Sequence, residues 1–145
     1  MKASLEVVIL PVSDPDRSLR FYRDQVGFDV DVDYAPIPGF RVIQLTLQGS
    51  STSIQFGVGL TDSPAGSMRG LYLVVTDIED CRRELRDRGV SVSDIRHKDT
   101  DGGWRGGFLA GPDPGHADYA SFADFRDPDG NAWVLQERGH LPICR

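Results

Sequence analysis

The candidate side chains for proton transfer lie in the last third of the chain. The three histidines are His97, His116 and His140, and Tyr119 and Asp124 follow His116 closely. Histidine, tyrosine and carboxylate side chains are common general acids and bases. His116, Tyr119 and Asp124 are therefore the candidate catalytic residues. The alternative is that the histidines are solvated loop residues without partners.

A metal site built from His97, His116 and Asp118 is a further interpretation of this segment. Imidazole and carboxylate groups bind first-row metals. However, the spacing of these three residues matches no common ligand pattern, and no strand or helix periodicity brings them together.

Asp124 differs in its setting from the aspartates that follow it. Asp127 and Asp129 belong to an Asp-Pro-Asp-Gly-Asn segment, which is typical of a tight turn whose aspartates bond the local backbone. Asp124 instead falls inside a predicted strand. A carboxylate that faces a cavity from a strand is a candidate general base.

The elements that must position these residues occur twice along the chain. Val12-Ser13-Asp14 opens a helical pattern that ends at Gly27, and Val75-Thr76-Asp77 opens a second that ends at Gly89. The distance between the two helix starts and the distance between the two closing glycines differ by one residue. Such self-similarity predicts two modules of one fold in tandem.

Each module reads as strand, helix and then three strands. The first module covers about residues 4–60, with strands predicted at residues 5–12, 28–34, 40–47 and 53–58 and a helix between the first two. A polar linker follows at about residues 61–67. The second module covers about residues 68–138, with strands predicted at residues 71–75, 90–95, 119–125 and 132–137. A long loop at residues 98–118 is where the two copies diverge.

This order resembles a known superfamily when combined with three short motifs: Ser-Leu-Arg-Phe-Tyr at residues 18–22, Gly27-Phe28, and Phe-Arg-Asp-Pro-Asp-Gly-Asn-Ala-Trp at residues 125–133. The chain is similar to the glyoxalase/bleomycin resistance/dioxygenase group, the vicinal oxygen chelate fold, over residues 5–137. The resemblance implies an α+β fold in which tandem βαβββ modules form a cupped, eight-stranded mixed sheet around a ligand. It also implies a homodimer, with modules paired within one chain or swapped across the dimer.

Enzymes of this group commonly hold one divalent metal through His, Glu or Gln side chains from four strands. The resemblance places these positions on Val7, Gln55, Gly70 and Val134. Valine and glycine side chains carry no donor atom, whereas a divalent ion needs three or four N, O or S ligands. A one-residue shift adds only Glu6 as a ligand. We therefore expect no family metal and no other cofactor, and a metal on other ligands is the alternative.

Strand alternation predicts which polar side chains line the cup. Gln44, Gln55, Tyr72 and Gln136 fall on the cup-facing side of their strands. Amides on an apolar wall suit a neutral or weakly polar organic ligand, and Trp104 and Phe108 of the long loop could stack on a flat one. The alternatives are that the amides bond one another or face solvent, and that the aromatic side chains anchor the loop.

Composition excludes some classes of function. The net charge of -6 argues against a nucleic-acid-binding protein, and no apolar run is long enough to span a membrane. Two cysteines and no signal-peptide pattern predict a cytoplasmic protein with free thiols, and a Cys81–Cys144 bridge is the alternative.

Three functions remain open on these grounds. The first is a metal-independent protein that binds a small organic molecule, of the sequestration or resistance type. The second is an enzyme, either a lyase, isomerase or dioxygenase with non-standard metal ligands, or a metal-free acid–base catalyst. The third is an interaction module whose cup is filled by its own side chains. Fold alone does not choose among them.

Overall fold

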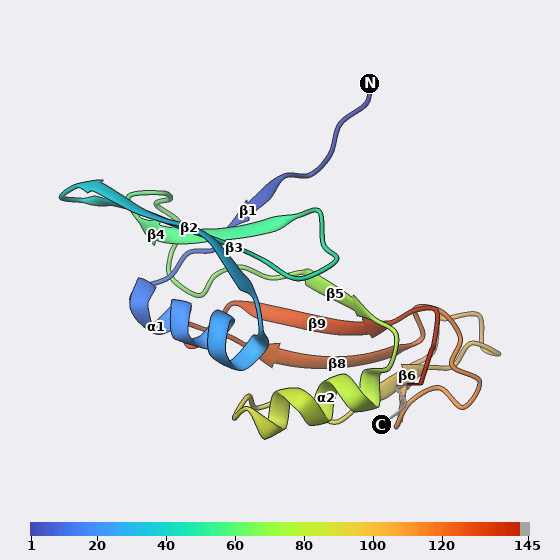
Figure 1. Ribbon diagram of the computed structural model, residues 1–145. Coiled ribbons are helices and arrows are strands. Elements are labelled where there is room, and N and C mark those ends of the chain that lie inside the picture. Colours follow the sequence, from blue (N-terminus) through green and yellow to red (C-terminus); the bar gives the residue numbers. More distant parts are fainter. Residues whose placement is uncertain (143–145) are drawn as a thin grey trace. The chain divides into compact units, whose positions relative to one another are not determined.

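The computed structural model describes residues 1–142, and the chain divides into two compact units (Figure 1). Unit 1 comprises Met1–Met68 together with Asp127–Asn131, and unit 2 comprises Arg69–Arg126 together with the residues from Ala132 onward. Unit 1 contains a four-stranded sheet and unit 2 a five-stranded sheet. The predicted α+β class is confirmed.

The sheet of unit 1 has the strand order β1-β4-β3-β2, with β1 parallel to β4 and the other pairs antiparallel. Its strands are β1 (Val7–Ile9), β2 (Asp29–Ile37), β3 (Phe40–Thr46) and β4 (Ser53–Val58). The buried positions of β3 and β4 alternate as predicted and include Ile43, Leu45, Ile54 and Phe56. One face of the sheet is therefore covered, and the other carries the half-buried Gln44 and Gln55.

Helical segments cover the buried face of unit 1, namely α1 (Pro15–Arg20) and the π-helical turn η1 (Phe21–Val26). The Asp14 side chain caps α1 by accepting a hydrogen bond from the Arg17 N–H at 3.1 Å. The ring of Tyr22 packs on Phe56, with 5.7 Å between ring centroids. Gly27 ends the helical segment with φ of 102°, a left-handed conformation that glycine adopts without strain.

The turn at residues 127–131 joins two strands of unit 2 but is itself part of unit 1. The buried Asp127 accepts backbone hydrogen bonds at Oδ1 from residues 129–131, at 2.9 to 3.0 Å. Its Oδ2 accepts from the Tyr22 hydroxyl and from Asn131 Nδ2, each at 2.8 Å. The predicted turn chemistry is confirmed for Asp127, but it was wrong for Asp129, whose Oδ1 accepts from the N–H and the hydroxyl of Ser13 instead of the local backbone.

The sheet of unit 2 has the order β5-β9-β8-β6-β7. Its strands are β5 (Leu71–Val75), β6 (Arg96–Lys98), β7 (Phe108–Ala110), β8 (Ser121–Arg126) and β9 (Ala132–Glu137). Helix α2 (Ile78–Asp87) packs against β8 and β9 and is capped by Asp77, whose side chain accepts from the Asp80 N–H at 3.0 Å. Ile78 and Leu85 form the buried side of α2.

Two predicted elements of the second module were wrong. The strand expected at residues 90–95 is reduced to one bridge between Val92 and Phe125, and β6 begins only at Arg96. At this break the Ser93 hydroxyl donates to the Asp94 carbonyl and accepts from the Asp124 N–H, so a side chain replaces the backbone in a bond between the two segments. The loop expected at residues 98–118 contains β7, which pairs with β6 and adds a ninth strand.

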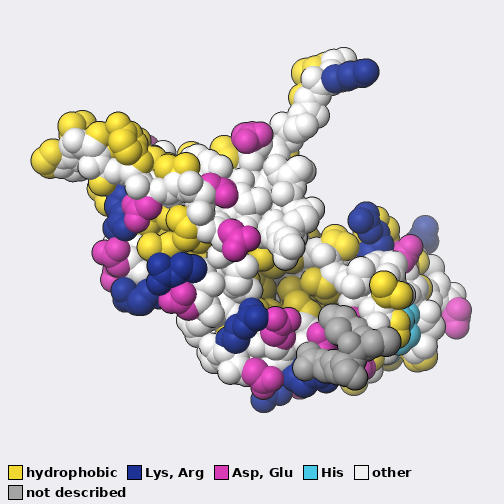
Figure 2. Space-filling view, in the orientation of Figure 1, with side chains coloured by type: hydrophobic (Ala, Val, Ile, Leu, Met, Phe, Trp, Pro, Cys, Tyr) yellow, Lys and Arg dark blue, Asp and Glu magenta, His cyan; other side chains and the backbone are white. Residues whose placement is uncertain are grey.

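The predicted strand at residues 28–34 extends further than expected and is exposed throughout as β2. Figure 2 shows hydrophobic side chains gathered over the hairpin of β2 and β3. The large apolar side chains exposed on β2 are Val30, Val32, Tyr34 and Ile37. Among the described residues, no helix has the length and apolar character that crossing a membrane requires.

Candidate functional site

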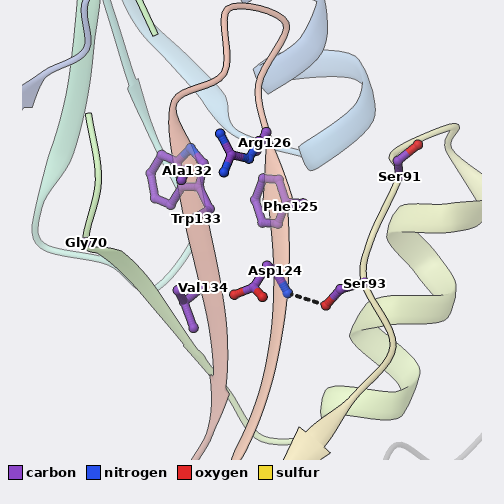
Figure 3. Close-up of a pocket in the computed structure, with 9 residues that line it drawn as sticks. All are labelled: Gly70, Ser91, Ser93, Asp124, Phe125, Arg126, Ala132, Trp133 and Val134. Carbon is purple, nitrogen blue, oxygen red and sulfur yellow. Dashed lines mark hydrogen bonds between the residues drawn. The ribbon is translucent and has the colours of Figure 1, made fainter. Parts of the chain in front are cut away.

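A cavity of about 500 Å³ lies in unit 2 at the end of the β8–β9 hairpin (Figure 3). Residues 124–126 of β8 and 132–134 of β9 supply most of its lining, as three consecutive cross-strand pairs. Gly70, Ser91 and Ser93 complete the lining. Ligand pockets commonly have this volume.

Short side chains leave room for the cavity, and two buried aromatic residues support its wall. Phe125 and Trp133 lie opposite each other on β8 and β9, with ring planes 2° apart and centroids 6.0 Å apart. Ala132 and Val134 leave space on β9 because their side chains are short. At Gly70, φ is 78° and no atom lies within 4 Å of where a Cβ would stand, so the backbone borders open space.

Asp124 and its partners provide the charged wall of the cavity. Arg96 Nη1 donates to Asp124 Oδ2 at 2.7 Å, and Nη2 donates to Oδ1 at 3.3 Å. The Asp124 N–H donates to the Ser93 hydroxyl at 2.8 Å, as Figure 3 shows. The Arg96 guanidinium also lies over the rings of Phe108 and Phe122, 4.7 and 5.6 Å from their centroids. These contacts hold the carboxylate in one orientation.

Of the three candidate catalytic residues, Asp124 alone lines the cavity. Its side chain is 46% exposed and paired with Arg96, so the environment is that of a half-exposed ion pair. Tyr119 lies elsewhere, where its hydroxyl accepts from Arg138 Nη1 at 3.1 Å. His116 contacts Glu137, with 2.8 Å between Nδ1 and Oε1.

The predicted ligand-binding residues do not line this cavity. Gln44 and Gln55 belong to unit 1 and bond each other, with Gln55 Nε2 donating to Gln44 Oε1 at 2.8 Å. Gln136 donates to the Tyr119 carbonyl at 3.1 Å. The remaining predicted residues are exposed side chains of unit 2: Tyr72, Trp104 and Phe108. Phe108 reaches the cavity wall indirectly, through Arg96.

Several cavity residues were not predicted from the sequence. Ser91 and Ser93 lie in the segment that was expected to be a strand, and Trp133 was noted only as part of a turn motif. One signal for them was present, because Gly70 and Val134 are two of the four positions that the family resemblance assigned to metal ligands. Both line the cavity.

The side chains at the four assigned positions do not fit a metal ion. Val7, Gly70 and Val134 offer no donor atom, and the Gln55 carboxamide is hydrogen-bonded to Gln44. The alternative set of His97, His116 and Asp118 is not brought together either. Instead, His97 Nδ1 contacts the Gly111 carbonyl at 2.7 Å.

Cys81 is not a candidate nucleophile at neutral pH. Burial, reinforced by neighbouring carboxylates, raises the pKa of its thiol to about 11. A thiol with this pKa is almost fully protonated at pH 7. Cys144, the partner in the alternative bridge, lies outside the described residues.

Comparisons with known proteins agree with this architecture. Residues 4–135 match the Glyoxalase/Bleomycin resistance protein/Dioxygenase superfamily. The structure of TnmS3, an antibiotic binding protein from Streptomyces sp. CB03234, is similar with a TM-score of 0.70 and 29% identity, covering 94% of this chain and 96% of that one. A glyoxalase/bleomycin resistance protein from the same organism gives a TM-score of 0.68 and 30% identity, covering 92% of this chain and 99% of that one.

A further relative comes from Bacillus subtilis (strain 168). The uncharacterized protein YetH is 22% identical over 144 residues, which cover 94% of this chain and 100% of YetH. The family match extends over most of both modules and agrees with the motifs at residues 18–22 and 125–133. The chain belongs to the Glyoxalase/Bleomycin resistance protein/Dioxygenase superfamily.

Proposed function

We propose that this protein binds a small organic molecule, that the cavity of unit 2 forms part of the site, and that binding uses no metal there. The observation that carries the proposal is the cavity of about 500 Å³ at the β8–β9 hairpin. An open cavity of this size also argues against a module filled by its own side chains. The biological role that fits is sequestration of, or resistance to, the bound molecule.

The lining supports a largely apolar ligand with few polar groups. Ala132 and Val134 offer apolar contacts, and the almost fully buried Phe125–Trp133 pair supports this wall from within the sheet. The Asp124 carboxylate, held by Arg96, can accept a hydrogen bond from a ligand hydroxyl or amine. Small aromatic and polyketide-like compounds have this combination of groups.

The relatives support binding over catalysis. TnmS3 is described as an antibiotic binding protein, and its structure is similar over 94% of the present chain. The side chains at the family positions Val7, Gly70 and Val134 lack donor atoms, which disfavours the family's metal chemistry in this chain.

The second candidate function is enzymatic, and one observation favours it. Asp124 is an oriented carboxylate on the wall of a cavity, which is the placement that a metal-free general base needs. A lyase, isomerase or dioxygenase with non-standard metal ligands is the other form of this alternative.

A thermal-shift screen with small aromatic and polyketide-like compounds tests the proposed function. We expect a compound that raises Tm, binds equally well in the presence of EDTA, and is recovered unchanged by mass spectrometry. Conversion of the compound would favour the enzyme, and EDTA-sensitive binding in the cavity or the absence of any stabilising compound would contradict the proposal.

We also propose that two copies of the chain pair. Apolar side chains are exposed on β2 in unit 1, and Tyr72 and Val74 are exposed on β5 in unit 2. A second copy of the chain would cover these surfaces. Light scattering coupled to gel filtration should give twice the mass of 16.0 kDa. A monomer at micromolar concentration would contradict pairing.

A further inference from the structure

Unit 2 contains a second polar cluster, formed by His116, Glu137 and His140. Glu137 is the last residue of β9, and its side chain points to the sheet face opposite that of Val134. His116 Nδ1 lies 2.8 Å from Glu137 Oε1, and His140 Nδ1 lies 3.4 Å from Oε2. One donor atom from each of the three side chains lies within 4.8 Å of the others.

The carboxylate of Glu137 is deeply buried, with 1% of the residue exposed. A buried negative charge is costly unless hydrogen bonds and a positive charge compensate it. The Ile78 N–H, at the start of α2, donates to Oε2 at 2.9 Å. Within residues 1–142, the ion pairs of Glu137 are with the two imidazoles alone. A cation held between this carboxylate and the two imidazoles would compensate its charge.

The two imidazole rings are stacked, with centroids 3.6 Å apart and planes 9° apart. His140 Nδ1 is buried and makes no hydrogen bond within the described part of the chain. His116 adopts φ of 50°, in the left-handed region that non-glycine residues seldom occupy.

We propose that His116, Glu137 and His140 bind a divalent first-row metal ion of the zinc type. Two imidazole nitrogens and one carboxylate oxygen form a ligand set found in zinc sites and in iron(II) sites. Each imidazole lone pair lies in the plane of its own ring, so a shared ion requires one ring to turn about Cβ–Cγ. The His140 ring would be the one to turn, because its Nδ1 makes no hydrogen bond to any residue in 1–142.

The ion would join three segments of unit 2: the loop before β8, the end of β9 and the residues that follow β9. These ligands share none of the positions at which the family resemblance expects a metal. Because the cluster and Val134 occupy opposite faces of β9, the metal site is independent of the proposed ligand cavity.

Calorimetric titration of the EDTA-treated protein, made without a histidine tag, with zinc chloride tests the proposal. We expect one zinc ion per chain and a higher Tm. His116→Gln and His140→Gln should each weaken binding by about tenfold or more. His97→Gln is the matched control and should bind zinc like the wild type, because His97 contacts the Gly111 carbonyl outside the cluster.

Imidazole NMR of the wild type gives a readout that does not depend on the folding of variants. The chain has three histidines, so zinc should shift the signals of two and leave the third in place. The proposal is overturned if no zinc binds at a zinc concentration of about 100 μM, because protein zinc sites bind far more tightly than that. It is also overturned if the His116→Gln, His140→Gln double variant binds zinc as well as the wild type.

Discussion

Arg96 on β6 and Asp124 on β8 form a two-point ion pair, with nitrogen–oxygen distances of 2.7 and 3.3 Å. Asp124 lines the cavity, whereas Arg96 does not. The guanidinium is itself fixed over the rings of Phe108 and Phe122. The orientation of the carboxylate is therefore set by a residue behind the cavity wall, and its exposed side remains available to a ligand.

Asp124→Asn should weaken binding of a ligand that carries a hydroxyl or amine donor while leaving the fold stable. The pair is partly exposed, at 29% for Arg96 and 46% for Asp124, so its loss should lower the free energy of unfolding by about 1 kcal/mol or less. Urea denaturation and ligand titration of one preparation measure both effects. Asp94→Asn is the control, because exposed Asp94 pairs with Arg82 and neither side chain lines the cavity. Equal affinity in both variants would contradict the role of Asp124.

Asn131→Ala should destabilise unit 1 strongly. The Asn131 side chain is fully buried, donates to the Pro11 carbonyl at 2.9 Å and to Asp127 at 2.8 Å, and accepts from the Met68 N–H at 3.0 Å. Removing these bonds in a buried setting should cost about 2–4 kcal/mol of unfolding free energy in urea. Replacement of the exposed Asp62 by Ala should cost less than about 0.5 kcal/mol. Similar losses in both variants would show that the turn is not anchored as described.

Cys81 should react slowly with thiol reagents in the folded protein. Its pKa of about 11 leaves about one thiol in a thousand ionised at pH 8. In a Cys144→Ser variant, the rate with Ellman's reagent should rise about tenfold for each pH unit between 8 and 10. Unfolding in guanidinium should make the thiol react within seconds. Fast reaction of the folded protein at pH 8 would indicate an exposed thiol.

The sequence could predict elements that depend on neighbouring residues. Asp14 and Gly27 mark the ends of the first helical segment through local bonds and a local conformation, so their residue types are informative. The strands at residues 53–58, 71–75 and 132–137 were predicted with the bounds that the structure shows. Strong local periodicity explains this accuracy.

Most of the candidate site could not be predicted, because it depends on pairings between distant residues. Ser91 and Ser93 line the cavity only because the β8–β9 hairpin lies beside them. The His116–Glu137–His140 cluster unites a loop with a strand end, which no spacing indicates. The alternation of side chains along the strands did place Gln44 and Gln55 on one face of the sheet, but it could not show that they are hydrogen-bonded to each other.

The most direct measurement compares ligand affinity in two tryptophan variants. Val134 lines the cavity, whereas Val74, on the neighbouring strand β5, is exposed outside it. The compound identified by the thermal-shift screen is titrated calorimetrically into Val134→Trp, Val74→Trp and the wild type. If the cavity is the binding site, Val134→Trp weakens binding by about tenfold or more, which corresponds to about 1.4 kcal/mol, and Val74→Trp changes it by less than about twofold. Unchanged affinity in a folded Val134→Trp protein would contradict this account.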